Sequence, residues 1–573
     1  MALLAAAPPS GTLAMTATAV PNLLHPEPEL CLNATALSQT LTFAFATGAM
    51  GEAFGRILAS ARLAPSHFRP ECFARDLFLG DFVARCLCVR IDGTEYPVHR
   101  AALVRELCQP PSDVAVTALR QRVLAELAEK PELADGARRV WLKIRNVEQL
   151  LEAADRGKRY DAIGRRVEIL RAIREAIELA ATAFTGARSE LGRARDFALA
   201  TAAGAGFHDL VNLLEYEENL ATIDLRVRVG HDGQLRGFEI VRAEENRKNS
   251  FYVSPLRRLV ARLRMLFRGY RFREAEILGR LVNRVFDGVQ EAVIGLFQLG
   301  LHLEFYLAAL AFRERAVERG LSVCLPELVA STAAIPRFDA LFNPHLLIEE
   351  RPPCPTDVRT GPQALVIITG PNSGGKTRLL QALGLAQLLG QAGMFVPAAS
   401  ATLVTRGGLF ASLIQETVAD QPEGHLGMEL LRIRRLFEEL RTNSLVLMDE
   451  LCSGTNPSEG EEIFRLVVEL LAELEPQAFI TTHFLRFAAD LARDRPLSRL
   501  EFLKVELDEH QDPTYRFVDG VAPTSLAGKT AERLGVTREA LLALVAEKKG
   551  DEVPAPLEVA ESRPVTSPRF RAS

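Results

Sequence analysis

The stretch Leu365-Val-Ile-Ile-Thr-Gly-Pro-Asn-Ser-Gly-Gly-Lys-Thr377 decides the fold class of this chain. An apolar, strand-like run enters a Gly-x-x-x-x-Gly-Lys-Thr loop, and a helix-compatible stretch, residues 378–389, follows it. That order is the context of a phosphate-binding P-loop, in which backbone N–H groups and a helix N-terminus face a polyphosphate. The residues expected to bind nucleotide are Gly370, Pro371, Asn372, Ser373, Gly374, Gly375, Lys376 and Thr377.

The second feature is an acidic strand end. Residues 444–448 form an apolar run, and Asp449 and Glu450 follow it directly. In P-loop enzymes Mg²⁺ is held by a carboxylate at this place and by the loop hydroxyl, so we expect Thr377 and Asp449 to bind the metal. We expect Lys376 to reach the β- and γ-phosphates of ATP, and Glu450 to act as the general base that positions the attacking water. The alternative is a solvated acidic strand end.

His483 follows a third apolar run, residues 478–482. A lone histidine can simply be a hydrogen-bonded core or cap residue. At the end of the next strand it can also contact the γ-phosphate, and we expect this second, catalytic role.

The sequence divides into two regions of different pattern. Residues 61–345 are mostly helical, and past a Pro-rich linker at 351–355 short apolar runs alternate with helical stretches. This alternation predicts an α/β P-loop domain over residues 346–548, with a parallel sheet and its chemistry at the carboxyl ends of the strands. We expect residues 1–60 to be a poorly ordered segment that leads into a first helix, and residues 549–573 to be a disordered tail.

Two local patterns interrupt the helical region. Residues 110–113, Pro-Pro-Ser-Asp, predict that one helix stops and that Ser112 or Asp113 caps the next. Residues 222–242 alternate apolar and charged residues around Asp232-Gly233, which predicts a small β-hairpin.

Composition and charge exclude several classes of protein. The 573 residues are 48% apolar and 25% charged, which is ordinary for a soluble globular protein. Residues 292–312 are the most apolar stretch, but Gln298, His302 and Glu304 interrupt it, so we predict a buried helix and no membrane span. The first 55 residues lack Lys and Arg, unlike a signal peptide, and the eight scattered cysteines favour a reducing cytoplasm.

One local patch is strongly basic, although the net charge of the chain is only −5. Residues 256–273 contain seven arginines and no acids, opposite apolar residues at helical spacing. Such a face suits contact with the phosphate backbone of DNA, while a plain solvated helix face and a membrane-surface helix are the alternatives. The candidate DNA-binding residues are Arg257, Arg258, Arg262, Arg264 and Arg268.

These motifs resemble those of the MutS family. Residues 369–377 are similar to the family's phosphate loop, including the Pro-Asn pair after the first glycine. Asp449-Glu-Leu-Cys-Ser-Gly-Thr455 and the run ending on His483 resemble its Walker B, dimer-loop and switch-histidine elements. The close similarity covers about residues 345–545, and residues 100–340 are similar in layout to the family's core and lever helices.

The resemblance implies an α-helical core and lever region followed by an ABC-type ATPase domain. It also implies a homodimer through that domain, with the nucleotide between the subunits and a clamp that grips DNA. By the same resemblance Asn372 joins Lys376 and Thr377 in binding nucleotide and Mg²⁺, and His483 reads the γ-phosphate.

The chain departs from the family pattern in two places. Gly424-His425-Leu426 stands where the family has a Ser-Thr-Phe signature, so the serine hydroxyl that caps the γ-phosphate is missing. Near the N-terminus there is no Phe-x-Glu mismatch-reading motif. We therefore expect a reduced homologue with core, levers and ATPase domain but no mismatch-reading domain.

The leading hypothesis is a cytoplasmic MutS-like ATPase that couples ATP binding and hydrolysis to DNA binding by a clamp-like dimer, in mismatch repair or recombination control. One alternative is an ATP-driven factor that acts on ribosomes, RNA or another protein assembly. Another is a regulatory nucleotide-binding module with low turnover, which the missing signature serine favours.

Overall fold

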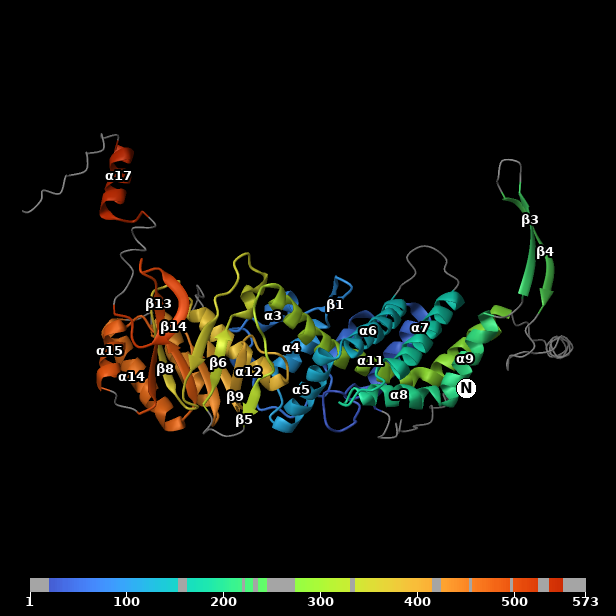
Figure 1. The fold of residues 1–573 in the computed structure, drawn as a ribbon, viewed down its shortest axis with the longest axis horizontal. Coiled ribbons are helices and arrows are strands. Elements are labelled where there is room, and N and C mark those ends of the chain that lie inside the picture. Colours follow the sequence, from blue (N-terminus) through green and yellow to red (C-terminus); the bar gives the residue numbers. More distant parts are fainter. Residues whose placement is uncertain are drawn as a thin grey trace, which may run out of the picture.

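The computed structural model describes residues 20–152, 162–218, 222–229, 235–244, 274–329, 335–414, 424–452, 456–494, 498–523 and 535–549. The molecule is elongated, with an α/β region at one end, a helical region in the middle and a β-hairpin at the other end (Figure 1). The predicted order of a helical region followed by an α/β P-loop region is confirmed.

The helical region is built around one long helix, α11. Its helices are α1 (Ala34–Thr47), α2 (Gly51–Ala59), η2 (Pro70–Cys72, a 3-10 turn), α3 (Leu79–Cys86), α4 (Arg100–Cys108), α5 (Val114–Glu129), α6 (Pro131–Glu152), α7 (Ala162–Ala183), α8 (Gly192–Ala202), α9 (Ala205–Glu218) and α11 (Glu274–Glu318). Its strands form two antiparallel pairs, β1 (Val89–Ile91) with β2 (Thr94–Tyr96) and β3 (Thr222–Val229) with β4 (Leu235–Glu244).

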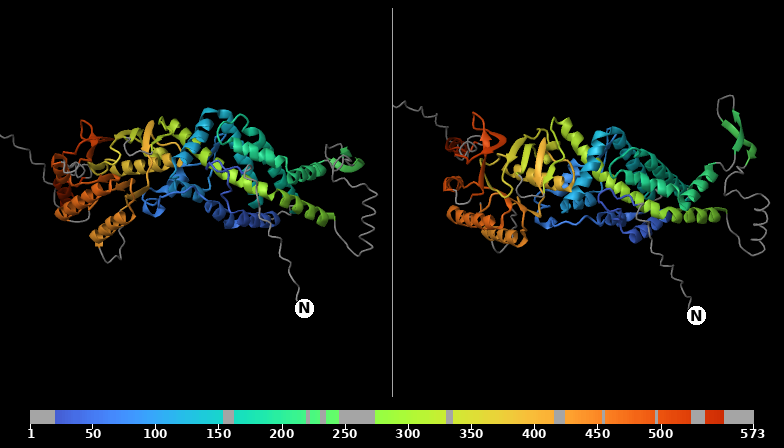
Figure 2. Two further views of the ribbon diagram at one scale, coloured as in Figure 1. Left: turned by 90° about the horizontal axis from the view of Figure 1, so that it is seen from below. Right: turned by 60° about the horizontal axis from the view of Figure 1, so that its bottom comes forward.

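Helix α11 is long and apolar enough to cross a membrane by length and composition, but the fold buries it. It runs for 45 residues, and 94% of its most apolar window lies inside the molecule. Helices α1, α5, α6, α7 and α9 pack around it, as both views in Figure 2 show for its central part. The predicted buried helix at residues 292–312 is therefore confirmed as core.

The expectation of a poorly ordered segment over residues 1–60 is wrong for residues 20–60. They include α1 and α2, and one face of α1, with Leu37, Leu41 and Phe45, is buried. Phe45 stacks on Phe286 of α11 with ring centroids 3.9 Å apart. The low charge of this stretch therefore reflects packing against α11. Residues 1–19 and the predicted tail from 550 onward lie outside the described residues.

The α/β region holds two sheets. Six strands, β10 (Gly408–Ser412), β11 (Ser444–Met448), β12 (Gln477–Thr481), β8 (Leu365–Thr369), β13 (Leu500–Leu507) and β14 (Pro513–Asp519), form the larger sheet in that spatial order. The smaller sheet has the order β5 (Glu327–Val329), β9 (Ser400–Val404), β6 (Arg337–Leu341) and β7 (Thr356–Arg359), with the 3-10 turn η3 (Pro344–Ile348) beside it. The remaining helices are α12 (Lys376–Ala392), α13 (Gly424–Glu439), α14 (Pro457–Leu474), α15 (Leu485–Asp494) and α17 (Arg538–Lys549).

The larger sheet places the predicted motifs at one edge. Strands β10, β11, β12, β8 and β13 are parallel, and only β14 runs antiparallel to its neighbour. Every residue of β8, β11 and β12 is buried, which explains their continuous apolar sequence. Because these three strands are neighbours, the loops that follow their carboxyl ends meet. Helix α12 packs on β11 and β12, and α4 and α5 of the helical region cover it further.

Candidate functional site

The phosphate loop joins β8 to α12 through a backbone that only certain residues can adopt. Gly370 has a φ of 144°, and a Cβ built there would lie 2.6 Å from Cγ2 of Val505. Gly375, the N-cap of α12, has a φ of 89°, in the left-handed region. Both glycines are thus required by conformation or space. The loop ends at the N-terminus of a 17-residue helix, where free backbone N–H groups favour an anion.

Lys376 lies at the centre of this loop. Its Nζ donates to the carbonyl oxygens of Gly370 and Pro371, at 3.1 and 3.2 Å, and the residue is only 5% exposed. Burial lowers the pKa of Lys376, while the nearby carboxylates Glu450 and Asp449 act to raise it. A buried cation held by loop carbonyls is positioned to meet negative charge in the loop.

Asp449 is bound by hydroxyl groups on both sides. Thr377 Oγ1 donates to Asp449 Oδ2 at 2.5 Å, and Thr481 Oγ1 donates to Asp449 Oδ1, also at 2.5 Å. The structure therefore brings the loop hydroxyl and the strand-end carboxylate together, as the sequence predicts. Thr481, at the end of β12, belongs to the run that ends on His483, but the sequence motifs give it no role. Its hydroxyl joins the Thr377 hydroxyl and the Asp449 carboxylate in one hydrogen-bonded group.

Glu450 has a strained backbone and faces the cavity beside the loop. Its φ is 51°, in the left-handed region that non-glycine residues seldom adopt, and its N–H donates to Thr481 Oγ1 at 2.7 Å. Such a backbone conformation persists only where the surrounding contacts enforce it, and here the bond to Thr481 contributes. Thr481 thus fixes both acidic residues, through the side chain of Asp449 and the backbone of Glu450.

His483 lies two residues beyond β12 and its side chain is exposed. Its ring is tilted against that of Phe484, with centroids 4.3 Å apart. His483 is not among the described residues that line the cavity at the phosphate loop. Its contact with the γ-phosphate stays a prediction. The five candidate arginines between 257 and 268, and residues 453–455 of the dimer-loop motif, lie outside the described residues.

A cavity of about 550 Å³ opens on the phosphate loop. Besides the loop and Glu450, its walls come from the Pro-rich stretch at 351–354, from Phe342 and Leu346, and from Tyr515 and Phe517 of β14. The composition of residues 351–355 predicts a linker, because Pro-rich stretches are typical of linkers. The structure shows that this stretch also forms a wall of the cavity, which its composition could not reveal.

The cavity fits a nucleoside triphosphate with its metal. Its volume is typical of small-molecule sites, and it combines apolar walls with the N–H groups and lysine of the loop. The oxygens of Thr377 and Asp449, 2.5 Å apart, are the hard ligands that Mg²⁺ prefers. These residues can therefore hold ATP and Mg²⁺.

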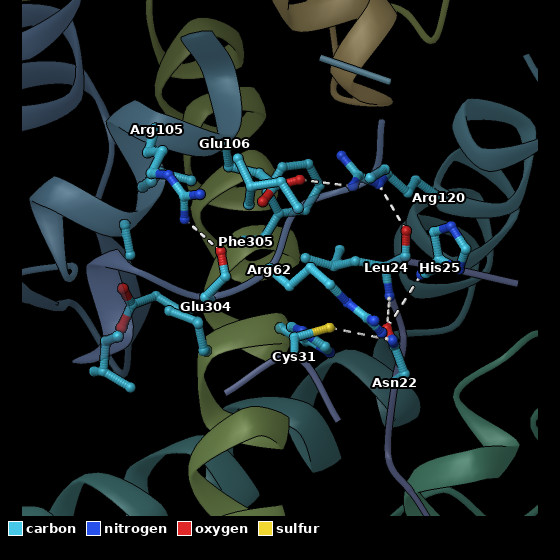
Figure 3. A pocket seen from close by; sticks show the side chains of 18 of the residues that line it. Asn22, Leu24, His25, Cys31, Arg62, Arg105, Glu106, Arg120, Glu304 and Phe305 are labelled. Atoms are coloured by element: carbon cyan, nitrogen blue, oxygen red, sulfur yellow. Dashed lines mark hydrogen bonds and ion pairs between the residues drawn. The ribbon is translucent and has the colours of Figure 1, made fainter. Parts of the chain in front are cut away.

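A second cavity, of about 350 Å³, lies in the helical region between the chain near Asn22 and helices α2, α4, α5 and α11 (Figure 3). At its edge the buried Arg120 forms an ion pair with Glu106, at 2.6 Å, and donates to the carbonyl of Leu24 at 3.0 Å. Arg120 Nη1 also donates to the carbonyl of Ala392, at 3.1 Å, at the end of α12. This arginine joins the helical region to the helix that begins at the phosphate loop.

The parallel strands, the loop and the acidic strand end together define a P-loop ATPase. More particularly, residues 366–548 match the family described as MutS domain V, so this part of the chain is a MutS domain V, an ABC-type ATPase domain.

Several curated relatives share this region. The chain is 33% identical over 275 residues to "Endonuclease MutS2" of Thermomicrobium roseum, which covers 47% of this chain and 34% of the relative. The protein of the same name from Thermus thermophilus is 37% identical over 177 residues, 31% of this chain and 24% of the relative. The protein of that name from Streptococcus uberis is 34% identical over 217 residues, which are 36% of this chain and 27% of the relative. The matches thus span about a third or less of each relative.

Proposed function

We propose that this protein is a cytoplasmic, Mg²⁺-dependent MutS-like ATPase that couples ATP binding and hydrolysis to DNA binding as a clamp-like homodimer, in mismatch repair or recombination control. The observation that carries the proposal is the meeting of Thr377, Asp449 and Thr481 beside the phosphate loop. The resemblance to "Endonuclease MutS2" proteins supports an action on DNA.

Each residue at the loop has one proposed task. The backbone of residues 370–375 and the side chain of Lys376 bind the phosphates, and Asn372 assists them. Bound Mg²⁺ would neutralise charge on the β- and γ-phosphates. Thr377 and Asp449 hold that ion, and Thr481 keeps the Asp449 carboxylate oriented. Glu450, which faces the cavity, orients the attacking water and takes its proton. His483 contacts the γ-phosphate from the end of the adjacent strand.

The dimer is proposed from the resemblance to the MutS family, and the DNA contact from the basic stretch at residues 256–273. In the proposed dimer, His425 or a backbone N–H of the partner takes the place of the missing signature serine and closes the site. The basic stretch at residues 256–273 supplies charge for the DNA backbone without reading sequence.

Nucleotide binding and turnover in two variants test the ATPase part. Lys376→Ala should lose affinity for labelled ATP, because it removes the buried cation of the loop. Glu450→Gln should bind ATP normally but hydrolyse it at least about a hundredfold more slowly, since it removes the proposed base. Equal ATP affinity of Lys376→Ala and the unaltered protein would contradict the site. Unchanged turnover in Glu450→Gln would instead favour the low-turnover regulatory module.

DNA binding is tested separately, with and without ATP, on linear and branched duplexes at several salt concentrations. The proposal expects binding that weakens as salt rises and changes with ATP. An active ATPase that binds no DNA under any nucleotide condition, but sediments with ribosomes, would support the alternative of an RNA- or ribosome-directed factor.

A further inference from the structure

A short segment of the helical region, residues 69–77, reaches the edge of the ATPase sheet. We call it the junction segment. It contains η2 and precedes α3, and η2 contacts β10, the edge strand of the larger sheet. Two of its carbonyl oxygens accept hydrogen bonds from the α/β region, Glu71 from Arg435 of α13 and Leu77 from His345 of η3. The junction segment is thus bonded on two sides.

Asp76 of the junction segment holds the chain at the end of β10. Its Oδ1 accepts from two consecutive backbone N–H groups, Leu413 at 2.6 Å and Ile414 at 3.0 Å. A carboxylate bound by two backbone N–H groups is a charge-assisted arrangement, stronger than bonds to a neutral acceptor. It fixes the direction of the main chain as it leaves the sheet.

The end of β10 is in turn bonded to the proposed metal ligand. Asp449 N donates to Ser412 O at 2.9 Å, and Ser412 directly precedes Leu413. The backbone of Asp449 is therefore one hydrogen bond and one peptide unit away from the groups that Asp76 holds. Its side chain is meanwhile oriented by Thr377 and Thr481.

The neighbour of Asp76 is fixed against the helix that begins at the phosphate loop. Leu77 is fully buried, and a Cβ placed on Gly384 of α12 would lie 2.8 Å from Leu77 Cδ2. Gly384 thus leaves room for this leucine. Because Leu77 cannot shift without disturbing α12, the position of Asp76 follows the position of the ATPase core.

We propose that Asp76, supplied by the helical region, is a positioning residue for Asp449 in the ATPase site. The inference rests on the proposed role of Asp449 as a Mg²⁺ ligand. Asp76 acts through Leu413, Ile414 and Ser412 on the backbone of Asp449, and touches neither the nucleotide nor the metal. It makes the geometry of the metal site depend on how the helical region sits against the sheet.

The test compares Asp76→Ala with the unaltered full chain in ATP hydrolysis titrated with Mg²⁺. Direct hydrogen-bond partners of metal ligands alter metal affinity or activity about 10- to 100-fold when removed. Asp76 acts one step further out, so we expect the half-saturating Mg²⁺ concentration to rise by about five- to tenfold. ATP affinity measured in EDTA should stay unchanged, because the phosphate loop is intact. Asp81→Ala is the matched control. Asp81 lies on α3, is 62% exposed and is 3.5 Å from Arg100, so its loss should leave the Mg²⁺ titration unchanged.

Asp76→Asn tests the role of Asp76 if Asp76→Ala does not fold. The amide oxygen can still accept both N–H bonds but lacks the charge, so we expect a rise of about two- to threefold. A folded Asp76→Ala, or otherwise a folded Asp76→Asn, with the Mg²⁺ titration of the unaltered protein would overturn the inference. A different failure, no Mg²⁺-dependent hydrolysis by the unaltered protein, would instead overturn the proposed function.

Discussion

Asp449 divides its two carboxylate oxygens between threonines from different parts of the chain. Thr377 opens α12 and Thr481 closes β12, and each hydroxyl lies 2.5 Å from one oxygen. A carboxylate held on both sides has little freedom to rotate. Its orientation is therefore fixed by the protein itself, as the proposed role of Asp449 in binding Mg²⁺ requires.

Thr481→Val should weaken Mg²⁺ binding at the proposed metal site but leave ATP binding at the phosphate loop intact. The change keeps the shape of the side chain but removes the donor to Asp449 and the acceptor for Glu450 N–H. We expect the half-saturating Mg²⁺ concentration to rise about tenfold and kcat to fall. The measurement is ATP hydrolysis as a function of Mg²⁺ concentration.

The adjacent Thr482 offers a matched control for this prediction. It is equally buried, but its hydroxyl accepts only from the backbone N–H of Phe484, at 3.1 Å, among the hydrogen bonds of the described residues. Thr482→Val should leave the Mg²⁺ dependence as it is. If both variants had the same Mg²⁺ dependence, Thr481 would have no special role.

The sequence predicts the contact of Thr377 with Asp449, because in P-loop enzymes the loop hydroxyl and the strand-end carboxylate bind the same Mg²⁺. It does not predict Thr481. That residue matters only because β12 lies between β11 and β8 in the sheet, and spatial strand order is not written in any local pattern. The role of Asp76 cannot be predicted from the sequence for the same reason, since Asp76 is 337 positions away from Leu413 along the chain.

At the scale of secondary-structure elements, a partly buried charge cluster joins three helices. His99, just before α4, contacts Glu304 of α11 at 3.0 Å and Glu148 of α6 at 3.2 Å. Arg145 bonds the second oxygen of Glu148, and Trp141 donates to Glu304. Burial lowers the pKa of His99, but the two carboxylates outweigh it and raise the pKa to about 9.

This cluster predicts a loss of stability at alkaline pH. The folded-state pKa of His99, about 9, lies above its ordinary value of 6.5, so the stabilisation is complete below pH 6.5 and is lost as pH rises through 9. Urea unfolding at pH 7, 8.5 and 10 should show a fall in the free energy of unfolding. His99→Gln should make that fall smaller, and an equal fall in both proteins would contradict the assignment.

Arg120 is a second element-scale link, since it bonds α4, the chain at Leu24 and the end of α12. Arg120→Met should lower the free energy of unfolding by about 3–5 kcal/mol, because Glu106 would stay buried without its partner. Adding Glu106→Gln should restore part of this loss. Arg122→Met is the control. Arg122 pairs with Glu190 but is 59% exposed, so we expect a cost of at most about 1 kcal/mol in the same measurement.

Helix boundaries with a clear stop and cap are predictable from the sequence. The Pro-Pro-Ser-Asp stretch ends α4 at Cys108 and starts α5 at Val114, and Asp113 accepts from Ala115 N at 2.8 Å. The first helices, α1 and α2, are not predictable in this way, because residues 1–60 are Ala- and Thr-rich and nearly uncharged. Their order comes from packing on α11, more than 200 residues further along the chain, which composition does not reveal.

At the scale of the whole molecule, the ATPase sheet and the β3–β4 hairpin lie at opposite ends of the helical region (Figure 1). The basic stretch at residues 256–273 follows this hairpin in the sequence and precedes α11. In the proposed function, DNA contact by this stretch would be coupled to ATP hydrolysis through α11, the helix that follows it in the chain. The division into regions is predictable from pattern, whereas the distance between them depends on tertiary packing.

Replacing Arg257, Arg258, Arg262, Arg264 and Arg268 together by Ala should weaken DNA binding and flatten its salt dependence. For every phosphate that the variant no longer neutralises, the slope of log affinity against log salt should become shallower by about 0.9, whatever the DNA sequence. ATP hydrolysis without DNA should not change. DNA titrations at several salt concentrations measure the slope. An unchanged slope would show that these arginines form only a solvated face.

Helix α11 has a geometric consequence for such coupling. At about 1.5 Å per residue, its 45 residues span about 67 Å, and the most apolar window of the helix is 94% buried. A rotation of only about 5° at one end of a rod of this length displaces the other end by about 6 Å. In the proposed function, a small rotation of α11 at the end that leads into β5 would therefore be enlarged into a displacement of several ångströms at its other end.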